Sequence, residues 1–315
     1  MIEAEKKKQL LLTKTWVVCG LAMICCALWG SAFPCIKLGY NMMGIEGSDT
    51  ASQILYAGER FTLAGILTVI LGSLTQRKIL LPKKKELGHV LVLCMLQTVL
   101  QYLFFYVGLA HTSGVKASII EGMNVFVALL VAALLFHQEK LSLQKLLGCL
   151  IGFAGVVLVN MAGSSLNMEI SLFGEGFIFF STVAYAFSSV VMKSFSKTDN
   201  PVMLSGYQFV LGGIIMMACG KMAGGEFMEY NAPRFAMLFY LAMISAVAYS
   251  LWSILLKYNP VSKVAVFGFM NPVCGVILSA ILLKEKDTLG ISCLLALILV
   301  CLGIYVVNGK DWKKE

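Results

Sequence analysis

Long apolar segments recur along the whole chain and are separated by short polar links. Each segment is about 20 residues long, which is the length an α-helix needs to cross the hydrocarbon core of a bilayer. The segments are apolar on all faces, whereas the strands of a membrane β-barrel alternate between polar and apolar positions. We expect ten transmembrane helices, over residues 16–38, 53–73, 88–110, 115–136, 143–161, 172–192, 202–222, 235–256, 262–283 and 289–307. The pattern therefore predicts an all-α polytopic membrane protein.

Composition supports this class of protein. Of the 315 residues, 59% are hydrophobic and 13% are charged, whereas an ordinary soluble domain carries about 25% charged residues. The ten cysteines all lie inside apolar segments, where a cysteine behaves as a small hydrophobic side chain. No metal-type spacing and no phosphate-binding loop is found. The sequence therefore predicts no disulfide framework, no metal site and no cofactor.

Part of the sequence repeats. The stretch 102–139 joins two apolar segments through a short polar link, and the stretch 261–285 resembles its second part. Both contain a Met-Asn pair, Met123-Asn124 and Met270-Asn271, and these pairs lie 147 residues apart. A repeat unit of five helices is odd-numbered, so its second copy must cross the membrane upside down. Two inverted five-helix repeats are typical of secondary transporters, whose substrate site lies near the midplane between the halves.

This repeat divides the chain into predicted units. They are a cytoplasmic tail at 1–15, a first five-helix repeat at 16–161, an extracytoplasmic linker at 162–171, a second repeat at 172–308 and a cytoplasmic tail at 309–315. The basic residues set the orientation, because cytoplasmic segments are enriched in lysine and arginine. With a cytoplasmic N-terminus, most basic residues fall in cytoplasmic segments, including Lys6, Lys7, Lys8, Lys14, Arg77, Lys78, Lys83, Lys84, Lys85, Lys140, Lys145, Lys193, Lys197, Lys257, Lys263, Lys310, Lys313 and Lys314. We expect a multi-pass protein of the plasma or inner membrane with both termini in the cytoplasm. This distribution explains the net charge of +8 without a nucleic-acid partner.

Several segments resemble a known family. They are Ala27–Phe33 followed by Lys37-Leu38-Gly39, Arg60-Phe61 with Ala64-Gly65, the stretch Tyr102–Glu139, and Tyr249–Lys257 continuing through Pro272 to Glu285. In this order and spacing, over nearly the whole chain, they resemble the EamA-type members of the drug/metabolite transporter superfamily. The resemblance implies a ten-helix carrier with an enclosed cavity, which moves small organic solutes and often exports amino acids or other metabolites. One departure is visible, since the family often has a proline in the fourth helix where this chain has Asn124-Val125-Phe126.

Glu121 is the most informative candidate residue. It lies about 10 Å into the membrane along the fourth helix, counting 1.5 Å per residue from Gly114. A carboxylate at that depth is costly unless it is paired, hydrated or protonated. Helical spacing places Ser118 and Glu121 on one face, which we expect to line the cavity. Glu121 either binds a cationic group or takes up a coupling proton. The alternative is a structural ion pair with Lys37 or Arg60.

Other polar and aromatic positions complete the predicted site. Lys37 either snorkels to the outer interface or supplies a counter-charge, and Arg60 either anchors the helix or holds a carboxylate. For the rest, simple packing is the alternative to lining the cavity. The further candidates are Gln97, Gln101, Tyr102, Tyr106, Asn124, Tyr185, Ser189, Tyr249, Trp252 and Asn271. Pro34 and Pro272 are hinge candidates, because proline removes a helical hydrogen bond. Gly148 and Gly152 predict close helix packing within the monomer rather than a dimer.

The sequence predicts a secondary transporter of small organic solutes, such as metabolites or amino acids, that exports them by alternating access. Its partners are the solute, membrane lipid and, as one alternative for the coupling ion, a proton. A monomer or a weak dimer is expected. Two other classes stay open: a membrane-embedded enzyme acting on a lipid, and a non-transporting scaffold. The few acids in the links form no reactive cluster, and a scaffold would not need Glu121.

Overall fold

The computed structural model describes residues 2–112, 114–161, 171–282 and 291–309, and in these ranges the chain forms helices and no strand. Among these described residues, ten helical segments are long and apolar enough to cross a membrane. Six are single helices: α2 (Thr15–Met43), α3 (Thr50–Gln76), α8 (Leu143–Met161), α10 (Pro201–Met222), α11 (Ala232–Tyr258) and α14 (Ile291–Asn308). The predicted all-α polytopic fold with ten spans is confirmed.

Four spans are built from shorter pieces that follow one another directly. The third span joins η1 (Lys84–Glu86), α4 (Leu87–Leu93), η2 (Cys94–Leu100) and α5 (Gln101–Ala110), and the fourth joins α6 (Gly114–Gly122), α7 (Asn124–Leu130) and η3 (Val131–Leu135). The sixth span joins η4 (Leu172–Gly176) and α9 (Phe177–Phe195), and the ninth joins α12 (Val261–Ala265), η5 (Val266–Phe269) and α13 (Met270–Leu282). The predicted bounds agree with these within a few residues. The predicted linker at 162–171 and the tail at 309–315 lie almost wholly outside the described residues.

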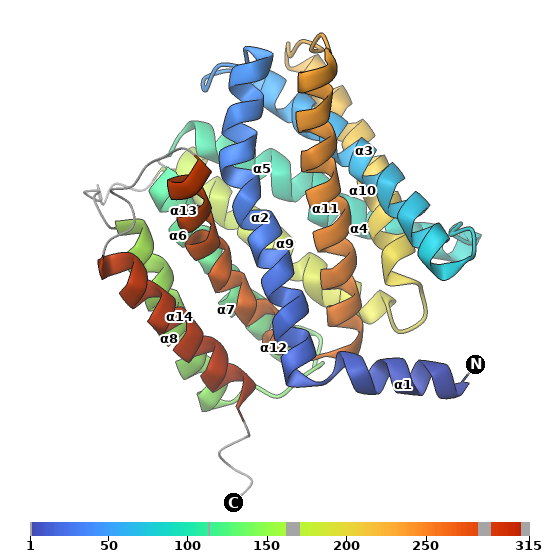
Figure 1. The fold of residues 1–315 in the computed structure, drawn as a ribbon, viewed down its shortest axis with the longest axis vertical. Coiled ribbons are helices and arrows are strands. Elements are labelled where there is room, and N and C mark those ends of the chain that lie inside the picture. Colours follow the sequence, from blue (N-terminus) through green and yellow to red (C-terminus); the bar gives the residue numbers. More distant parts are fainter. Residues whose placement is uncertain (1, 113, 162–170, 283–290, 310–315) are drawn as a thin grey trace, which may run out of the picture.

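The N-terminal segment forms a helix, although its polar and basic composition predicted only a tail. This helix, α1 (Ile2–Leu12), runs across one end of the bundle in Figure 1. Leu12 is buried, and its backbone carbonyl accepts a hydrogen bond of 2.9 Å from Asn259 Nδ2. Glutamate, lysine and leucine are good helix formers, so one anchored end suffices to hold the segment. We call the end of the bundle where α2 begins and α14 ends the terminal end.

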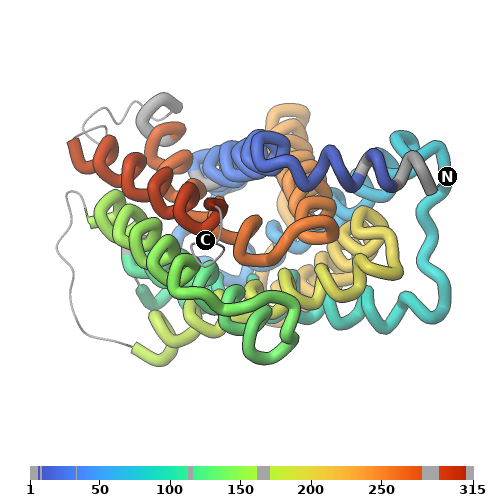
Figure 2. Tube along the Cα trace, turned by 90° about the horizontal axis from the view of Figure 1, so that it is seen from below, coloured from blue at the N-terminus to red at the C-terminus, as the bar shows by residue number. Residues whose placement is uncertain are grey.

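The spanning helices pack in recurring pairs. α3 lies along α10, and α8 lies along α14 at one edge of the molecule, as both views show (Figures 1 and 2). Between α8 and α14 a Cβ atom on Gly303 would lie 2.6 Å from the carbonyl oxygen of Gly148, so glycine permits the contact. The predicted close packing at Gly148 and Gly152 is therefore a contact within the chain. α2 packs against α11 and α13, while α9 packs against α5, α6 and α7.

Two spans change their helical geometry at similar places. α6 ends at Gly122 and α7 begins at Asn124, so the fourth span is interrupted at Met123 without a proline. In the ninth span the 3-10 turn η5 precedes α13, whose first residues are Met270, Asn271 and Pro272. Pro34, the other hinge candidate, is buried inside the continuous helix α2. Both interruptions lie beside the cavity described below.

Candidate functional site

A cavity of about 180 Å³ lies between the two halves of the chain. This volume is below the roughly 300 Å³ at which pockets for drug-sized ligands begin. Its walls come from α2, α3, α5, α6 and α7 in the first half, and from α9, α11, η5 and α13 in the second. The predicted site residues that line it are Arg60, Gln101, Tyr102, Tyr106, Ser118, Glu121, Asn124, Tyr185, Tyr249, Trp252, Asn271 and Pro272. The cavity therefore brings together residues that are far apart in the sequence.

Three predicted site residues and one hinge candidate do not line this cavity. Lys37 is exposed on α2. Gln97 is buried, and its Oε1 accepts a hydrogen bond of 3.2 Å from Gln208 Nε2 on α10, which joins the two helices. Ser189 is buried and donates to the backbone carbonyl of Tyr185 at 3.1 Å. Gln97 and Ser189 thus bond to helices of the bundle, Lys37 lies on the exposed surface, and Pro34 likewise lies away from the lining.

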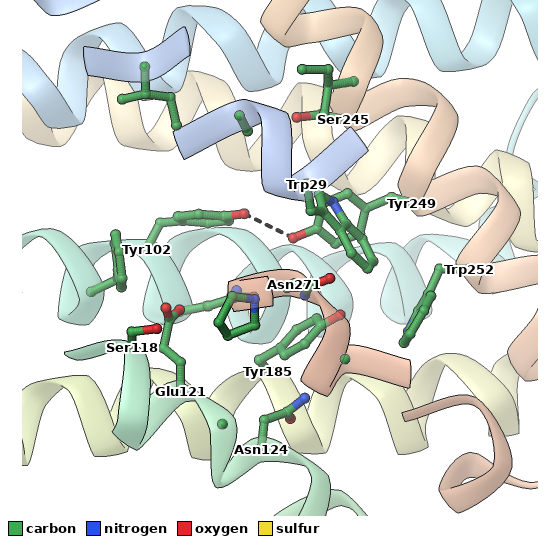
Figure 3. Close-up of a pocket in the computed structure, with 18 of the residues that line it drawn as sticks. Trp29, Tyr102, Ser118, Glu121, Asn124, Tyr185, Ser245, Tyr249, Trp252 and Asn271 are labelled. Carbon is green, nitrogen blue, oxygen red and sulfur yellow. Dashed lines mark hydrogen bonds between the residues drawn. The ribbon is translucent and has the colours of Figure 1, made fainter. Parts of the chain in front are cut away.

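Aromatic side chains form one wall of the cavity. The hydroxyls of Tyr102 on α5 and Tyr249 on α11 lie 2.9 Å apart and share a hydrogen bond (Figure 3). The ring of Trp29 on α2 packs edge-on against Tyr249 at 5.1 Å and against Trp252 at 5.0 Å between ring centroids. Such edge-to-face contacts add to the energy of burial. They fix the shape of the wall with residues from both halves.

Glu121 projects into the cavity from α6, on the same side as Ser118 (Figure 3). The ion pairs found among the described residues are His89–Asp199, Lys116–Glu175 and Lys145–Glu139. Within that part of the chain Glu121 has no ion pair with Lys37 or Arg60, and no hydrogen bond holds its carboxylate. The structural ion pair considered from the sequence is thus not formed. The carboxylate is available to a ligand or a proton.

Arg60 is the basic side chain that lines the cavity. It lies on α3, is 5% exposed, and its Nε has no hydrogen-bond partner in the described chain. The guanidinium carbon lies 4.4 Å from the ring centroid of Phe61 and 6.0 Å from that of Tyr102. Contacts of this kind with aromatic faces stabilise a cation partly. They supply no negative charge to neutralise it.

Asn124 and Asn271 line the cavity at the two interrupted spans. Asn124 is the first residue of α7, and Asn271 is the second residue of α13. The Oδ1 atoms of both are buried and lack partners among the described residues. Side-chain amides at helix interruptions are positioned to hydrogen-bond a polar group in the cavity. The Met-Asn repeat in the sequence therefore marks two related positions in one site.

Some lining residues were not among the predicted site residues. They are Trp29, Ala32, Ile36, Phe105, Gly122, Val125, Ile244, Ser245 and Gly268. Trp29 carried a signal, because it stands beside Gly30 and Ser31 within an apolar segment. The small and aliphatic residues carried none, since such residues face lipid, core and cavity alike. Among the described residues no group of three or more His, Cys, Asp or Glu is placed to hold a metal ion.

A helical bundle with ten spans, and with ionisable side chains in a cavity between its halves, has the architecture of a membrane transport protein. The comparison with known families agrees: the sequence profile of the EamA-like transporter family matches residues 16–161 and 172–309. The chain belongs to this family, and it is a membrane transporter. The resemblance seen in the sequence motifs is confirmed.

Similar proteins are named as transporters. A protein of Archaeoglobus fulgidus named "uncharacterized transporter" is 28% identical over 94% of this chain and 99% of its own length. A protein of Bacillus subtilis named "uncharacterized transporter YvbV" is 27% identical over 96% of this chain and 94% of its own length. A "probable amino-acid metabolite efflux pump" of Escherichia coli is 26% identical over 93% of this chain and 96% of its own length. A solved crystal structure superposes with a TM-score of 0.74 at 17% identity, covering 91% of this chain and 95% of that one. At that identity the superposition shows a shared fold.

Proposed function

We propose that this protein is a secondary transporter that carries a small organic solute through the cavity by alternating access. The observation that carries the proposal is Glu121, an acid inside a spanning helix that faces the cavity and has no partner among the described residues. Ionisable side chains within spans mark substrate or ion pathways. Glu121 binds a cationic group of the solute or takes up a coupling proton, and transport is driven by a proton or solute gradient.

The pairing of the spans supports an inverted repeat. If span n of the first half corresponds to span n + 5, then the pairs α3–α10 and α8–α14 each join corresponding spans. The pair α2–α11 then corresponds to α9–α5, and α2–α13 corresponds to α9 with the fourth span. A two-fold relation between the halves makes such a pattern. We infer two inverted five-helix repeats, 16–161 and 172–308, that rock against each other around the cavity.

Polar contacts join the halves at both ends of the bundle. At the terminal end the carboxylate of Glu139 accepts hydrogen bonds from the second half, from the backbone N–H of Ser262 at 2.9 Å and from the Ser262 hydroxyl. Lys145 Nζ in the first half also donates to this carboxylate, at 2.5 Å. At the opposite end Lys116 pairs with Glu175 at 2.8 Å, and the Tyr230 hydroxyl donates to Glu59 at 2.5 Å. Alternating access requires these two sets to open in turn.

We assign the remaining features on the same basis. From the distribution of basic residues we propose a plasma or inner membrane protein with both termini in the cytoplasm. The efflux-pump name of the Escherichia coli relative supports export, and metabolites or amino acids as the cargo. We propose a monomer or weak dimer surrounded by lipid, because the glycine contacts of α8 are used within the chain. A scaffold without transport would need neither the cavity nor Glu121. A lipid enzyme that uses a metal would need a cluster of ligands, and in the described part of the chain no group of three or more His, Cys, Asp or Glu is placed to hold a metal ion.

Transport by the purified protein in proteoliposomes tests the proposal. Vesicles are loaded in turn with amino acids, nucleosides, sugars and organic cations, and release is followed with and without a pH gradient. The proposal predicts saturable release of at least one class, which a cavity-filling variant such as Ser118→Trp abolishes. Lys37→Trp is the control, because Lys37 lies outside the cavity on exposed surface. Absence of release for every class would contradict the proposal.

A further inference from the structure

Arg60 and Glu121 line the same cavity with opposite charges and do not neutralise each other. No ion pair within 4.0 Å joins them, and among the described residues neither has another ion-pair partner. Removing two charges from water without pairing them is expensive in a protein, and more so within a membrane. A cavity that contains both side chains unpaired is therefore incomplete without a ligand that partners them.

Aromatic rings beside the guanidinium of Arg60 restrict the directions from which a ligand can approach it. The guanidinium lies near the rings of both Phe61 and Tyr102. In the described part of the chain no carboxylate lies within ion-pair distance of it. The group that neutralises Arg60 must therefore enter through the cavity. The planar fork of a guanidinium matches a carboxylate or a similar oxyanion through two parallel hydrogen bonds.

We propose that Arg60 is an oxyanion subsite, and that the transported solute is a zwitterion whose carboxylate binds Arg60 while its cationic group binds at Glu121. This inference rests on the proposed transport function and narrows its substrate. A solute with only a cation would leave Arg60 buried and unneutralised, and a solute with only an anion would leave Glu121 without a partner or protonated. The Asn124 and Asn271 amides lie on the same lining and add polar partners for the cationic end.

The aromatic wall and the volume fit the apolar part of such a solute. Trp29, Tyr102 and Tyr249 surround the cavity with ring edges and faces, and these bury apolar groups without a charge. A volume of about 180 Å³ leaves room for a compact molecule. The solute class is therefore a small zwitterion with a modest apolar body, and organic cations that lack an oxyanion are excluded as good substrates.

Matched ligands that differ by one charged group test the inference. The full chain in nanodiscs is titrated with phenylalanine, phenethylamine and 3-phenylpropionate, and with leucine, 3-methylbutylamine and 4-methylpentanoate. Binding is measured by calorimetry. We expect a zwitterion of at least one series to bind about 10-fold to 100-fold more tightly than its amine and its acid, since a charge-assisted contact contributes that much.

Variants connect the preference to Arg60. Arg60→Gln is expected to reduce the affinity for the zwitterion to that of the amine, and to leave the affinity for the amine unchanged. Arg60→Lys keeps the charge without the fork and gives an intermediate loss. Lys37→Gln removes an exposed charge outside the cavity and changes nothing. Because the ligand series uses the unaltered protein, the test stands even where Arg60→Gln does not fold.

Three outcomes would overturn the inference. They are equal affinity of the unaltered protein for a zwitterion and its amine in both series, no binding in either series, and an unchanged preference in Arg60→Gln. The solute panel in proteoliposomes separates this failure from failure of the proposed function. Release of a solute that lacks an oxyanion would support the transport function and contradict the Arg60 subsite. Absence of release for every class would contradict both proposals.

Discussion

Tyr102 and Tyr249 meet hydroxyl to hydroxyl at 2.9 Å, and they are 147 residues apart in the chain. The same offset separates Asn124 from Asn271, which also line the cavity. Two pairs of site residues thus share one offset in sequence. This is expected if the two halves are copies of one repeat unit, related by a symmetry axis that passes between the tyrosines. The charged residues break this relation, because the positions 147 residues after Arg60 and Glu121 hold Tyr207 and Gly268. Among the described lining residues, those that carry a charged group, Arg60 and Glu121, both come from the first half.

The Tyr102–Tyr249 bond makes a prediction about stability. Tyr102→Phe and Tyr249→Phe each remove the hydroxyl contact and keep the rings, so each should lower the free energy of unfolding by about 1 kcal/mol. The double variant should cost little more than the larger single effect, since both changes remove the same bond. Denaturation of the purified protein measures this, with Tyr305→Phe on an exposed position as the control. Fully additive losses would show that the two hydroxyls act independently.

The close approach of α2 and α13 requires a glycine at position 30. A Cβ atom at Gly30 would lie 2.6 Å from Cys274 Cβ and 2.9 Å from the backbone nitrogen of Gly275. Gly30→Ala should therefore force the helices apart and destabilise the protein by roughly 1–3 kcal/mol. Gly20 lies on the same helix with nothing within 4 Å of its Cβ position, so Gly20→Ala should be neutral or stabilising by up to about 1 kcal/mol. Equal melting temperatures for the two variants would contradict this packing.

We expect the carboxylate of Glu139 to hold the terminal end closed. The backbone N–H of Ser262 donates to its carboxylate at 2.9 Å, which joins the link after the fourth span to the start of the ninth. In Glu139→Gln the charge is lost, and we expect the hydrogen exchange of the Ser262 amide to accelerate about 10-fold or more, since hydrogen bonds to charged groups contribute about 1.5–3 kcal/mol. Glu226→Gln, at an exposed position, should leave that exchange unchanged. Unchanged protection of the Ser262 amide in Glu139→Gln would show that this contact does not hold the end closed.

The ten spans could be predicted because length and apolar composition are sufficient to define a membrane helix. The interruption at Met123 could not, because no proline or other local signal in the sequence marks it. The helix α1 was missed for a different reason. Its charged residues resemble those of a disordered tail, and the bond from Asn259 that anchors its end comes from 247 residues away.

The candidate site could be predicted in part. Glu121 and Arg60 were identifiable, because a charge inside a span needs a partner or a cavity. Gln97 satisfied the same rule and yet lies outside the cavity, because Gln208 on a neighbouring helix supplies its partner. Lys37 is long enough to reach the interface, and Ser189 bonds to its own helix. A polar residue in a span therefore indicates a need for a partner, and the sequence does not say whether a helix or a cavity provides it.

The central claim is that transport passes through the cavity and depends on the carboxylate of Glu121. The other charged or titratable side chains that line the cavity are Arg60, Tyr102, Tyr106, Tyr185 and Tyr249. The most direct measurement is release of a transported solute from proteoliposomes, with and without a pH gradient, for the unaltered protein, Glu121→Gln and the exposed control Glu46→Gln. We predict that Glu121→Gln loses the response to the gradient or slows release about tenfold or more, while Glu46→Gln does neither. Release by Glu121→Gln at the unaltered rate, with the unaltered response to pH, would contradict the account.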